Sequence, residues 1–204
     1  EAIANNNIEL VKLLLEYHAD LNIKDSNGNT PLALAKETGA KLHLCHCSTK
    51  DSVEMVRRAK EEGVKVTAEV CPHHFSMCSD DITSNDANFK MNPPLRSEQD
   101  KEALIRGIQD GTIDMIATDH APHSKEDLEH APFGIVGLET SVALTITNLV
   151  KKGHITPLQM AAKMSYNPAK VLGINKGTLN EGAIADVTII NPDKEYIIDS
   201  NEFA

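Results

Sequence analysis

The chain has 204 residues, 41% of them hydrophobic and 25% charged, which fits one globular domain or two small ones. Its formal net charge of -10 argues against a general nucleic-acid-binding role, because such proteins need a basic face. Four cysteines are too few for a disulfide-rich secreted scaffold, and no membrane-spanning apolar run or signal-peptide pattern is visible, so we expect a cytoplasmic protein.

The first part of the chain, residues 1–39, is predicted to be helical and to differ from the rest. Apolar residues recur at helical spacing from Ile8 onward, and Thr30-Pro31 suits the start of a further helix. The stretch LVKLLLEYHADLNIKDSNGNTPLALA resembles an ankyrin repeat, a unit that packs on neighbouring copies. We therefore expect an ankyrin-repeat-like segment here, through which a protein partner would bind.

From residue 41 the chain alternates between apolar β runs and helical stretches. Residues 41–47, 64–71 and 113–118 are predicted to be strands, the last two mostly apolar as in a buried parallel sheet. Strands that alternate with helices along a chain are typical of a parallel sheet or a barrel. The fold class predicted for this part is therefore α/β.

The helices that separate and follow these strands are predicted from their capping signals. Each begins at a Ser, Thr or Asn whose side chain can accept a hydrogen bond from the first turn. In two of them proline follows, where its missing N–H costs nothing. The predicted starts are Ser48 or Thr49, Ser97 with Asp100, Thr156 with Pro157, and Asn167 with Pro168.

The last 30 residues are predicted to form a small β element. Gly-containing turns separate the short β runs DVTII and EYIID. The predicted domain organisation is therefore an ankyrin-like segment at 1–40, an α/β body at 41–174 and a β element at 175–204.

Two residues at predicted strand ends are candidates for metal chemistry. His46 ends the first strand, and Asp119 ends the third within the stretch TDHAPHS. In α/β folds the carboxyl ends of the strands carry the active site, and His and Asp are suitable Zn²⁺ ligands. Asp beside a metal-bound hydroxide can also transfer its proton. Spacing alone leaves an alternative, in which Asp119 is a helix cap with a hydrogen-bonded neighbour.

A structural zinc site is a second interpretation of the Cys and His residues. The set that would supply its ligands is His43, Cys45, His46, Cys47, Cys71, His73, His74 and Cys78. Their spacing argues against such a site, because there is no CxxC and successive residues of a strand point to opposite faces, so neighbouring ligands diverge. Cysteines in buried strands act as small hydrophobes, which is the interpretation preferred for Cys45, Cys47 and Cys71.

Two polar residues in the loop KMNPPLR are open to more than one interpretation. Asn92 precedes proline, which is a common turn signal. Arg96 could contact an anion or could be a solvated charge.

Six stretches taken together resemble one enzyme family. They occur in this order: HLCHCSTKDSVEMVRRAKEEGVKVTAEVCPHHF, DANFKMNPPLR, GTIDMIATDHAPHSKED, APFGIVGLET, MSYNPAKVLGI and KGTLNEGAIADVTIINPDKEYIID. Residues from about 41 to 204 are similar to the C-terminal part of bacterial type I dihydroorotases, which belong to the amidohydrolase superfamily. The loop SKEDLEHAPFG is a few residues shorter than the family pattern.

The resemblance implies the last strands of a (β/α)8 barrel with part of a small β-sandwich. It implies the reversible cyclisation of N-carbamoyl-L-aspartate to dihydroorotate in pyrimidine biosynthesis, with two Zn²⁺ per complete site. Carried over by motif, His46 and Asp119 would be zinc ligands and Asp119 would also be the catalytic acid and base. The residues implied to contact substrate are Asn92, His123, and the backbone at Phe133 and Gly134. His120 would support the loop.

Several expected features have no counterpart in this sequence. The family's His-x-His motif, a bridging carboxylate and a further His should precede HCST, and we find none before His46. We therefore expect an incomplete site and negligible turnover by the isolated chain. The chain is also expected to begin inside a longer reading frame and to stop before the family's end, or to be a joining product near residue 40.

Two further functions remain alternatives. One is an ankyrin-type interaction fragment fused to a non-catalytic remnant. The other is a different cyclic amidohydrolase, such as an allantoinase or hydantoinase, whose motifs share FKMNPPLR and TDHAPHS.

Overall fold

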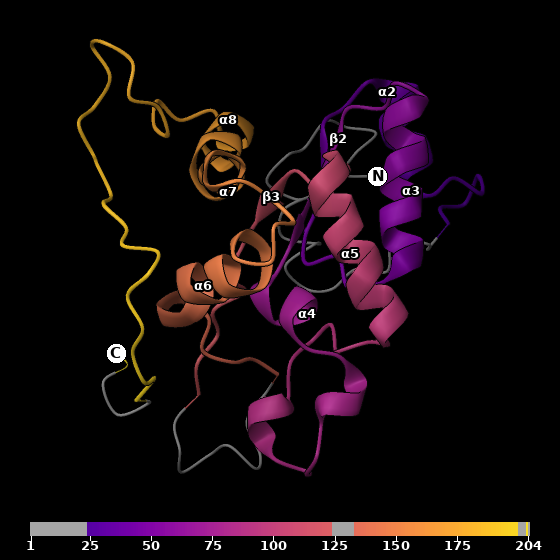
Figure 1. Cartoon of the computed structure of the whole chain (residues 1–204). Helices are drawn as coiled ribbons and strands as arrows, with labels where there is room; N and C mark the ends of the chain where they lie inside the picture. The colour runs from indigo at the N-terminus through magenta and orange to yellow at the C-terminus, as the bar shows by residue number, and fades with distance from the viewer. Residues whose placement is uncertain (1–23, 124–132, 200–202, 204) are drawn as a thin grey trace.

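The computed structural model describes residues 24–123, 133–199 and 203. Its centre is a parallel sheet with the strand order β1-β2-β3 (Figure 1). The strands are β1 (Leu42–Leu44), β2 (Val66–Val70) and β3 (Met115–Ile116), within the three predicted ranges. Because all three run parallel with β2 in the middle, their carboxyl ends meet at one edge of the sheet.

Two amphipathic helices, α3 (Lys50–Glu61) and α5 (Glu98–Asp110), lie side by side and supply much of the core (Figure 1). Their contact is close at Gly107, where an added Cβ would lie 2.9 Å from Val53 Cγ1. The sheet residues that join this core are mainly those of one alternating set, because successive strand side chains point to opposite faces. The predicted α/β body is therefore present.

Helix α2 (Pro31–Thr38) joins the same core. Ala35 is 1% exposed within the hydrophobic cluster that the sheet also enters, and Leu32 packs against that cluster. Lys36 Nζ lies 2.6 Å from Glu62 Oε2 just after α3. The helix predicted to start at Thr30-Pro31 is confirmed, whereas residues 1–23, which hold most of the ankyrin-like stretch, lie outside the described residues.

The capping signals predicted four helix starts correctly. In each, a Ser or Thr hydroxyl accepts a hydrogen bond from the backbone N–H three residues later, which satisfies a donor that the helix itself leaves unpaired. The caps are Thr30, Thr49, Ser97 and Thr156.

The prediction that Asn167 caps a helix is wrong. Helix α7 (Pro157–Ala161), the π-helical segment η4 (Ala162–Tyr166) and α8 (Asn167–Leu172) follow one another without a break, and Asn167 itself is helical. Its side-chain amide instead donates a 2.7 Å hydrogen bond to Asp114 O. A tertiary partner therefore replaces the local cap.

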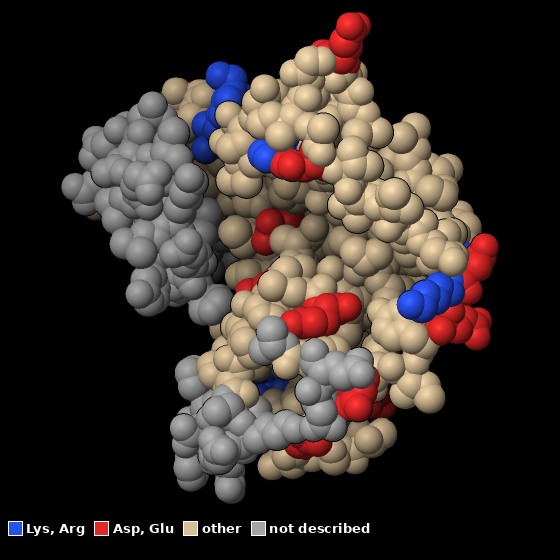
Figure 2. Space-filling view, turned by 90° about the vertical axis from the view of Figure 1, so that its left-hand side faces the viewer, with Lys and Arg blue, Asp and Glu red and all other residues tan. Residues whose placement is uncertain are grey.

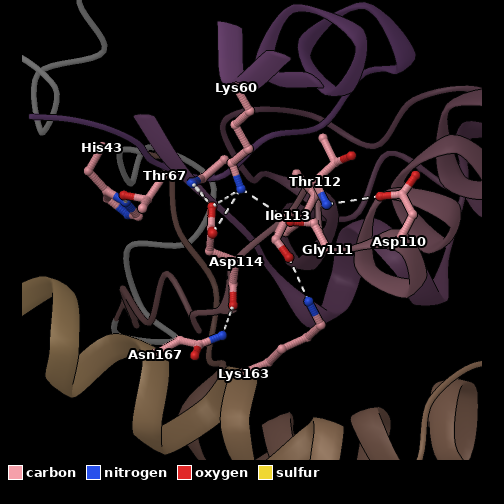
Figure 3. Close-up of polar contacts among 11 residues, drawn as sticks. His43, Lys60, Thr67, Asp110, Gly111, Thr112, Ile113, Asp114, Lys163 and Asn167 are labelled. Carbon is pink, nitrogen blue, oxygen red and sulfur yellow. Dashed lines mark hydrogen bonds and ion pairs between the residues drawn. The ribbon is translucent and has the colours of Figure 1, made fainter. Parts of the chain in front are cut away.

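A polar network holds the beginning of β3 (Figure 3). The Asp114 carboxylate accepts hydrogen bonds from Lys60 Nζ and from Ala68 N, both at 2.8 Å. Lys163 Nζ donates at 2.6 Å to Ile113 O, and burial lowers the pKa of this lysine. The network connects α3, β2 and the α7–α8 stretch at the amino edge of the sheet.

Shorter elements complete the described chain. They are α4 (Pro72–Ser76), η1 (Ser79–Asp81), η2 (Ala87–Phe89), α6 (Leu138–Thr145) and the π-helical η3 (Ile146–Val150). In the part of the chain that the structure describes, no helix has the length and apolar character needed to cross a membrane.

The small β element predicted for residues 175–204 is not formed in its described part. Residues 174–199 contain turns but no strand, and they run as a separate trace in Figure 1. A strand needs a neighbour for its backbone hydrogen bonds and a cover for its apolar face. The described residues of this segment have no neighbouring strand. Their apolar side chains are also uncovered, since Leu179, Ile189 and Ile197 are 81%, 93% and 93% exposed.

Candidate active site

The predicted metal ligands both lie just beyond strand ends. His46 follows β1 by two residues, and Asp119 follows β3 by three. Backbone pairing continues past the strands, since Cys47 N donates to Glu69 O at 2.9 Å and Ala117 N donates to Val70 O at 3.1 Å. The carboxyl edge of the sheet therefore presents both residues, on the two sides of β2.

His46 and Asp119 share an uncommon backbone conformation. Their φ angles are +36° and +51°, and they are the non-glycine residues with positive φ in the described ranges. Such a conformation costs about 1–3 kcal/mol in a non-glycine residue, so the surrounding structure must impose it. Strain of this kind concentrates at ligand-binding and catalytic positions. Nothing in the sequence pattern of either residue predicted it.

His120 fastens the chain after β3 to the start of α6. Its Nδ1 accepts hydrogen bonds from Gly137 N at 3.1 Å and Leu138 N at 3.2 Å, so Nδ1 carries no proton in this arrangement. A Cβ added to Gly137 would lie 2.7 Å from Thr118 O, which shows how closely the two segments approach. His120 thus holds the segment after β3 against the start of α6, and its Nδ1 is occupied by these two hydrogen bonds.

Three of the predicted substrate-binding residues lie together. Gly134 N donates to Lys90 O at 2.9 Å, and Lys90 Nζ lies 5.6 Å from the centre of the Phe133 ring. His123 Nε2 is 3.4 Å from Phe133 O. A Cβ added to Gly134 would lie 2.4 Å from Ala121 O, so only glycine fits. The Gly134 N–H is already engaged within the protein.

Asn92, the fourth predicted substrate-binding residue, lies in the adjoining loop two residues after Lys90. A cis peptide bond joins it to Pro93. His74 Nε2 is 2.8 Å from Pro93 O, which ties this loop to the segment that follows β2. Arg96 in the same loop is exposed. The hydrogen bond from His74 therefore links the candidate substrate loop to the carboxyl edge of the sheet.

The expectation that the Cys and His residues diverge is wrong for one group. Cys71, His73 and His74 each offer a ligand atom, and these atoms lie within 4.8 Å of one another. The expectation applied strand geometry to His and Cys residues on both sides of Pro72, but α4 begins at Pro72 and turns the chain. Proline directly after Cys71 was the available signal for a helix start.

Burial controls the protonation of this group. It lowers the pKa of His73 to about 3 and that of His74 to about 4, so both imidazoles are neutral near pH 7. The charge of His46 contributes to both shifts. Burial also raises the pKa of the Cys71 thiol, with a contribution from Asp119. Cys71 directly follows β2, so the group lies at the same carboxyl edge of the sheet as His46 and Asp119.

A second group lies on the sheet itself. The ligand atoms of His43, Cys45 and Glu69 also lie within 4.8 Å of one another. Both ring nitrogens of His43 have partners, Nδ1 with Thr67 Oγ1 at 2.8 Å and Nε2 with Glu69 Oε2 at 3.0 Å. This group is therefore a hydrogen-bonded network between β1 and β2.

The molecule has a hollowed face and, apart from it, a cavity between α2 and α3. The face seen in Figure 2 is hollowed, and acidic side chains lie in and around the hollow. A cavity of about 610 Å³ lies elsewhere, between α2 and α3, where Lys36 and Glu62 are among its lining residues. None of the candidate site residues lines that cavity.

Comparisons with known proteins place the chain in a family. A model of the amidohydrolase family matches residues 9–203. A dihydroorotase from Pelotomaculum thermopropionicum is 54% identical over 177 residues, which are 85% of this chain and 42% of that protein. A dihydroorotase from Bacillus cereus is 54% identical over 176 residues, covering 84% and 41%. The chain thus spans less than half the length of these curated relatives.

Solved structures give a related result. The L-hydantoinase (dihydropyrimidinase) from Arthrobacter aurescens has a TM-score of 0.71 at 30% identity, covering 87% of this chain and 44% of that one. The D-hydantoinase from a Bacillus sp. AR9 has a TM-score of 0.71 at 26% identity, covering 76% and 37%. The family match begins at residue 9, and the comparisons give no support to an ankyrin repeat in the first 39 residues.

Proposed function

The chain belongs to the amidohydrolase family, and we propose that it carries out its part of a dihydroorotase reaction, the reversible cyclisation of N-carbamoyl-L-aspartate to dihydroorotate. The observation that carries the proposal is the 54% identity to dihydroorotases over a region that includes His46 and Asp119. Hydantoinase structures are similar at 26–30% identity, which makes a hydantoinase-type activity the weaker alternative.

We propose that the sheet and its helices are the last strands of a (β/α)8 barrel at 41–174, followed by part of a small β-sandwich at 175–204. The parallel order β1-β2-β3 with intervening helices supports the first assignment. The exposed apolar side chains after residue 174 support the second, because they would need a covering layer.

The residue types at the carboxyl edge fit zinc. Imidazole and carboxylate are both Zn²⁺ ligands, and the strained backbones of His46 and Asp119 indicate that their placement is imposed. These two residues would hold zinc together with ligands from elsewhere in the complete site. Bound zinc would acidify a water molecule to a pKa of roughly 7 and polarise the ring carbonyl.

Asp119 has the main chemical role in this proposal. Its carboxylate accepts a proton from the attacking water as the ring amide is hydrolysed, and then delivers that proton to the leaving ring nitrogen. In the reverse direction the same oxygen takes a proton from the carbamoyl nitrogen as that nitrogen attacks the carboxyl carbon, and it returns the proton to the carboxyl oxygen that leaves as water, which closes the ring. His120 keeps the adjoining backbone in place through its two hydrogen bonds.

Asn92 and His123 would provide hydrogen bonds to the substrate from the loop side. The Gly134 N–H already donates to Lys90 O, so a substrate contact at Phe133-Gly134 would use another backbone group. The close approach of Gly134 to Ala121 places this backbone beside the chain that carries Asp119.

The test is complementation. We expect the 204-residue chain alone to give negligible ring opening, because His46 and Asp119 are only part of a dinuclear ligand set. The chain is then mixed with the preceding part of the Pelotomaculum relative, or its segment from Lys41 onward is fused to that part. Zn²⁺ is supplied in both cases. We expect dihydroorotate to be opened faster than hydantoin or dihydrouracil. A preference for the uncharged rings, or an inactive but folded fusion, would refute the proposal.

A further inference from the structure

Cys71, His73 and His74 form a compact group of buried side chains at the end of β2. Cys71 is 0% exposed, His73 7% and His74 3%. The two imidazole rings lie with their centres 4.2 Å apart and are tilted by 56°. Cys71 is the N-cap of α4 directly after β2, and His73 and His74 lie within the helix, so the backbone fixes their relative positions.

Two ring nitrogens in this group have no hydrogen-bond partner. They are His73 Nε2 and His74 Nδ1, and both are buried. A buried polar atom without a partner is rare in native proteins, because it has lost its hydrogen bonds to water without replacement. Both histidines are neutral near pH 7, since burial lowers their pKa values to about 3 and 4. Neutral imidazole is the form that binds metal ions.

The second nitrogen of His74 already has the partner that a metal ligand needs. Its Nε2 lies 2.8 Å from Pro93 O, which can only accept, so Nε2 carries the proton. The lone pair is therefore on Nδ1, the nitrogen without a partner. A metal-binding histidine almost always donates its other N–H to a carbonyl or carboxylate in this way.

The His43, Cys45 and Glu69 group differs in this respect. Its histidine has a hydrogen-bond partner at each ring nitrogen, and one of these partners is Glu69 itself. A metal ion there would have to displace both interactions. The Cys71 group has nothing to displace at the two unpartnered nitrogens.

We propose that Cys71, His73 and His74 bind a zinc-class transition-metal ion through one thiolate and two imidazoles. Thiolate and imidazole are the donors that Zn²⁺ and Co²⁺ accept in tetrahedral sites, with a fourth position left for water. Ligand atoms around such an ion are about 3.5 Å apart, so atoms that lie within 4.8 Å of one another need to approach by at most about 1.3 Å. Cys71 loses its thiol proton when the ion binds.

This site is separate in its donors from the proposed dihydroorotase chemistry. The pair His46 and Asp119 contains no sulfur, so a sulfur–metal signal cannot come from it. The proposed metal site can therefore be tested independently of the catalytic role proposed for Asp119. In the assembled enzyme the ion would hold the β2–α4 turn against the loop that carries Asn92, through the hydrogen bond between His74 and Pro93.

The experiment is a Co²⁺ titration of the reduced, metal-free 204-residue chain, followed by absorption spectroscopy. We expect a thiolate-to-cobalt charge-transfer band in the near ultraviolet that saturates at one equivalent. Cys71→Ser should abolish the band, and His73→Asn or His74→Asn should weaken binding at least tenfold. Cys45→Ser, Cys78→Ser and Asp119→Asn should each retain it.

Three results of the cobalt titration would overturn the proposal. They are the absence of the band in the wild-type chain, its survival in Cys71→Ser, or its loss in Cys45→Ser, which would assign it to the other group. Circular dichroism shows whether each variant is folded. X-ray absorption of the wild-type chain with one equivalent of Zn²⁺ needs no variant: a sulfur neighbour at roughly 2.3 Å is expected, and a shell of nitrogen and oxygen alone would refute the site.

Discussion

The two edges of the sheet satisfy their polar groups in different ways. At the amino edge, Asp114 accepts hydrogen bonds from Lys60 and Ala68, and Lys163 donates to Ile113 O. At the carboxyl edge, His73 Nε2 and His74 Nδ1 have no partner. His46 and Asp119 at the same edge have strained backbones. The amino edge is thus complete in itself, whereas the carboxyl edge has its polar groups arranged for something that binds there.

The largest effect is expected from Asp119→Asn in the complemented enzyme. Asparagine keeps the shape of the side chain but cannot carry a proton, so the ring-opening rate should fall by about 10²–10⁴. The denaturation midpoint of the 204-residue chain should change little. Steady-state assay and urea unfolding measure the two quantities. Asp193→Asn, in the exposed C-terminal segment, is the matched control and should keep full activity.

Acidification should destabilise the metal-free chain through the buried histidines. The folded-state pKa values of His73 and His74 lie below the unfolded value of about 6.5, so the unfolded chain binds more protons. The free energy of unfolding should therefore fall as pH decreases from about 6.5 toward 4, by up to roughly 1.4 kcal/mol per pH unit for each histidine.

Urea unfolding in chelator at several pH values measures that slope. His73→Gln should reduce it by about half. An unchanged slope in this variant would show that other groups cause the acid sensitivity.

Breaking the amino-edge network should affect stability and spare the carboxyl edge. Asp114→Ala leaves Lys60 and the Ala68 N–H without their acceptor, so unfolding should become easier by about 2 kcal/mol. Glu54→Ala removes an exposed partner of Arg57 and Arg58 and should destabilise the chain much less, because solvent screens surface ion pairs. An equal decrease in the free energy of unfolding in the two variants would contradict the view that the Asp114 network stabilises the fold more than the surface ion pairs of Glu54 do.

Gly134→Ala tests the close packing of the candidate substrate backbone. The new Cβ would lie 2.4 Å from Ala121 O, so the segment has to move. Gly153→Ala is the matched control, because Gly153 also has positive φ but nothing lies within 4 Å of its added Cβ. In the complemented enzyme we expect the first variant to raise KM and the second to leave it unchanged. Calorimetry should show only about 1 kcal/mol lost in the control.

The features that the sequence predicted are those with local causes. The three strands follow from apolar β runs, and the Thr49 and Ser97 caps follow from side chains that reach their own first turn. Asn167 has the same local signal, but the carbonyl of Asp114 captures its side chain. The β runs after residue 174 carry the right pattern without a neighbouring strand in the described residues.

The candidate site was predictable only in part. The positions of His46 and Asp119 just beyond strand ends can be predicted from the sequence, but their positive φ angles depend on tertiary structure. Strand alternation predicts that Cys71, His73 and His74 diverge. One element boundary, the helix start at Pro72, reverses that geometry. The placement of such a boundary therefore decides whether ligands converge or diverge.

The most direct test of the dihydroorotase proposal is removal and return of zinc. The complemented chain is treated with a chelator, assayed for dihydroorotate ring opening, and assayed again after Zn²⁺ is restored. We expect the activity to disappear and then to return, with no recovery in Asp119→Asn. Undiminished activity after complete metal removal, or full recovery in the Asp119→Asn chain, would contradict the assignment of this edge as a zinc-dependent amidohydrolase site.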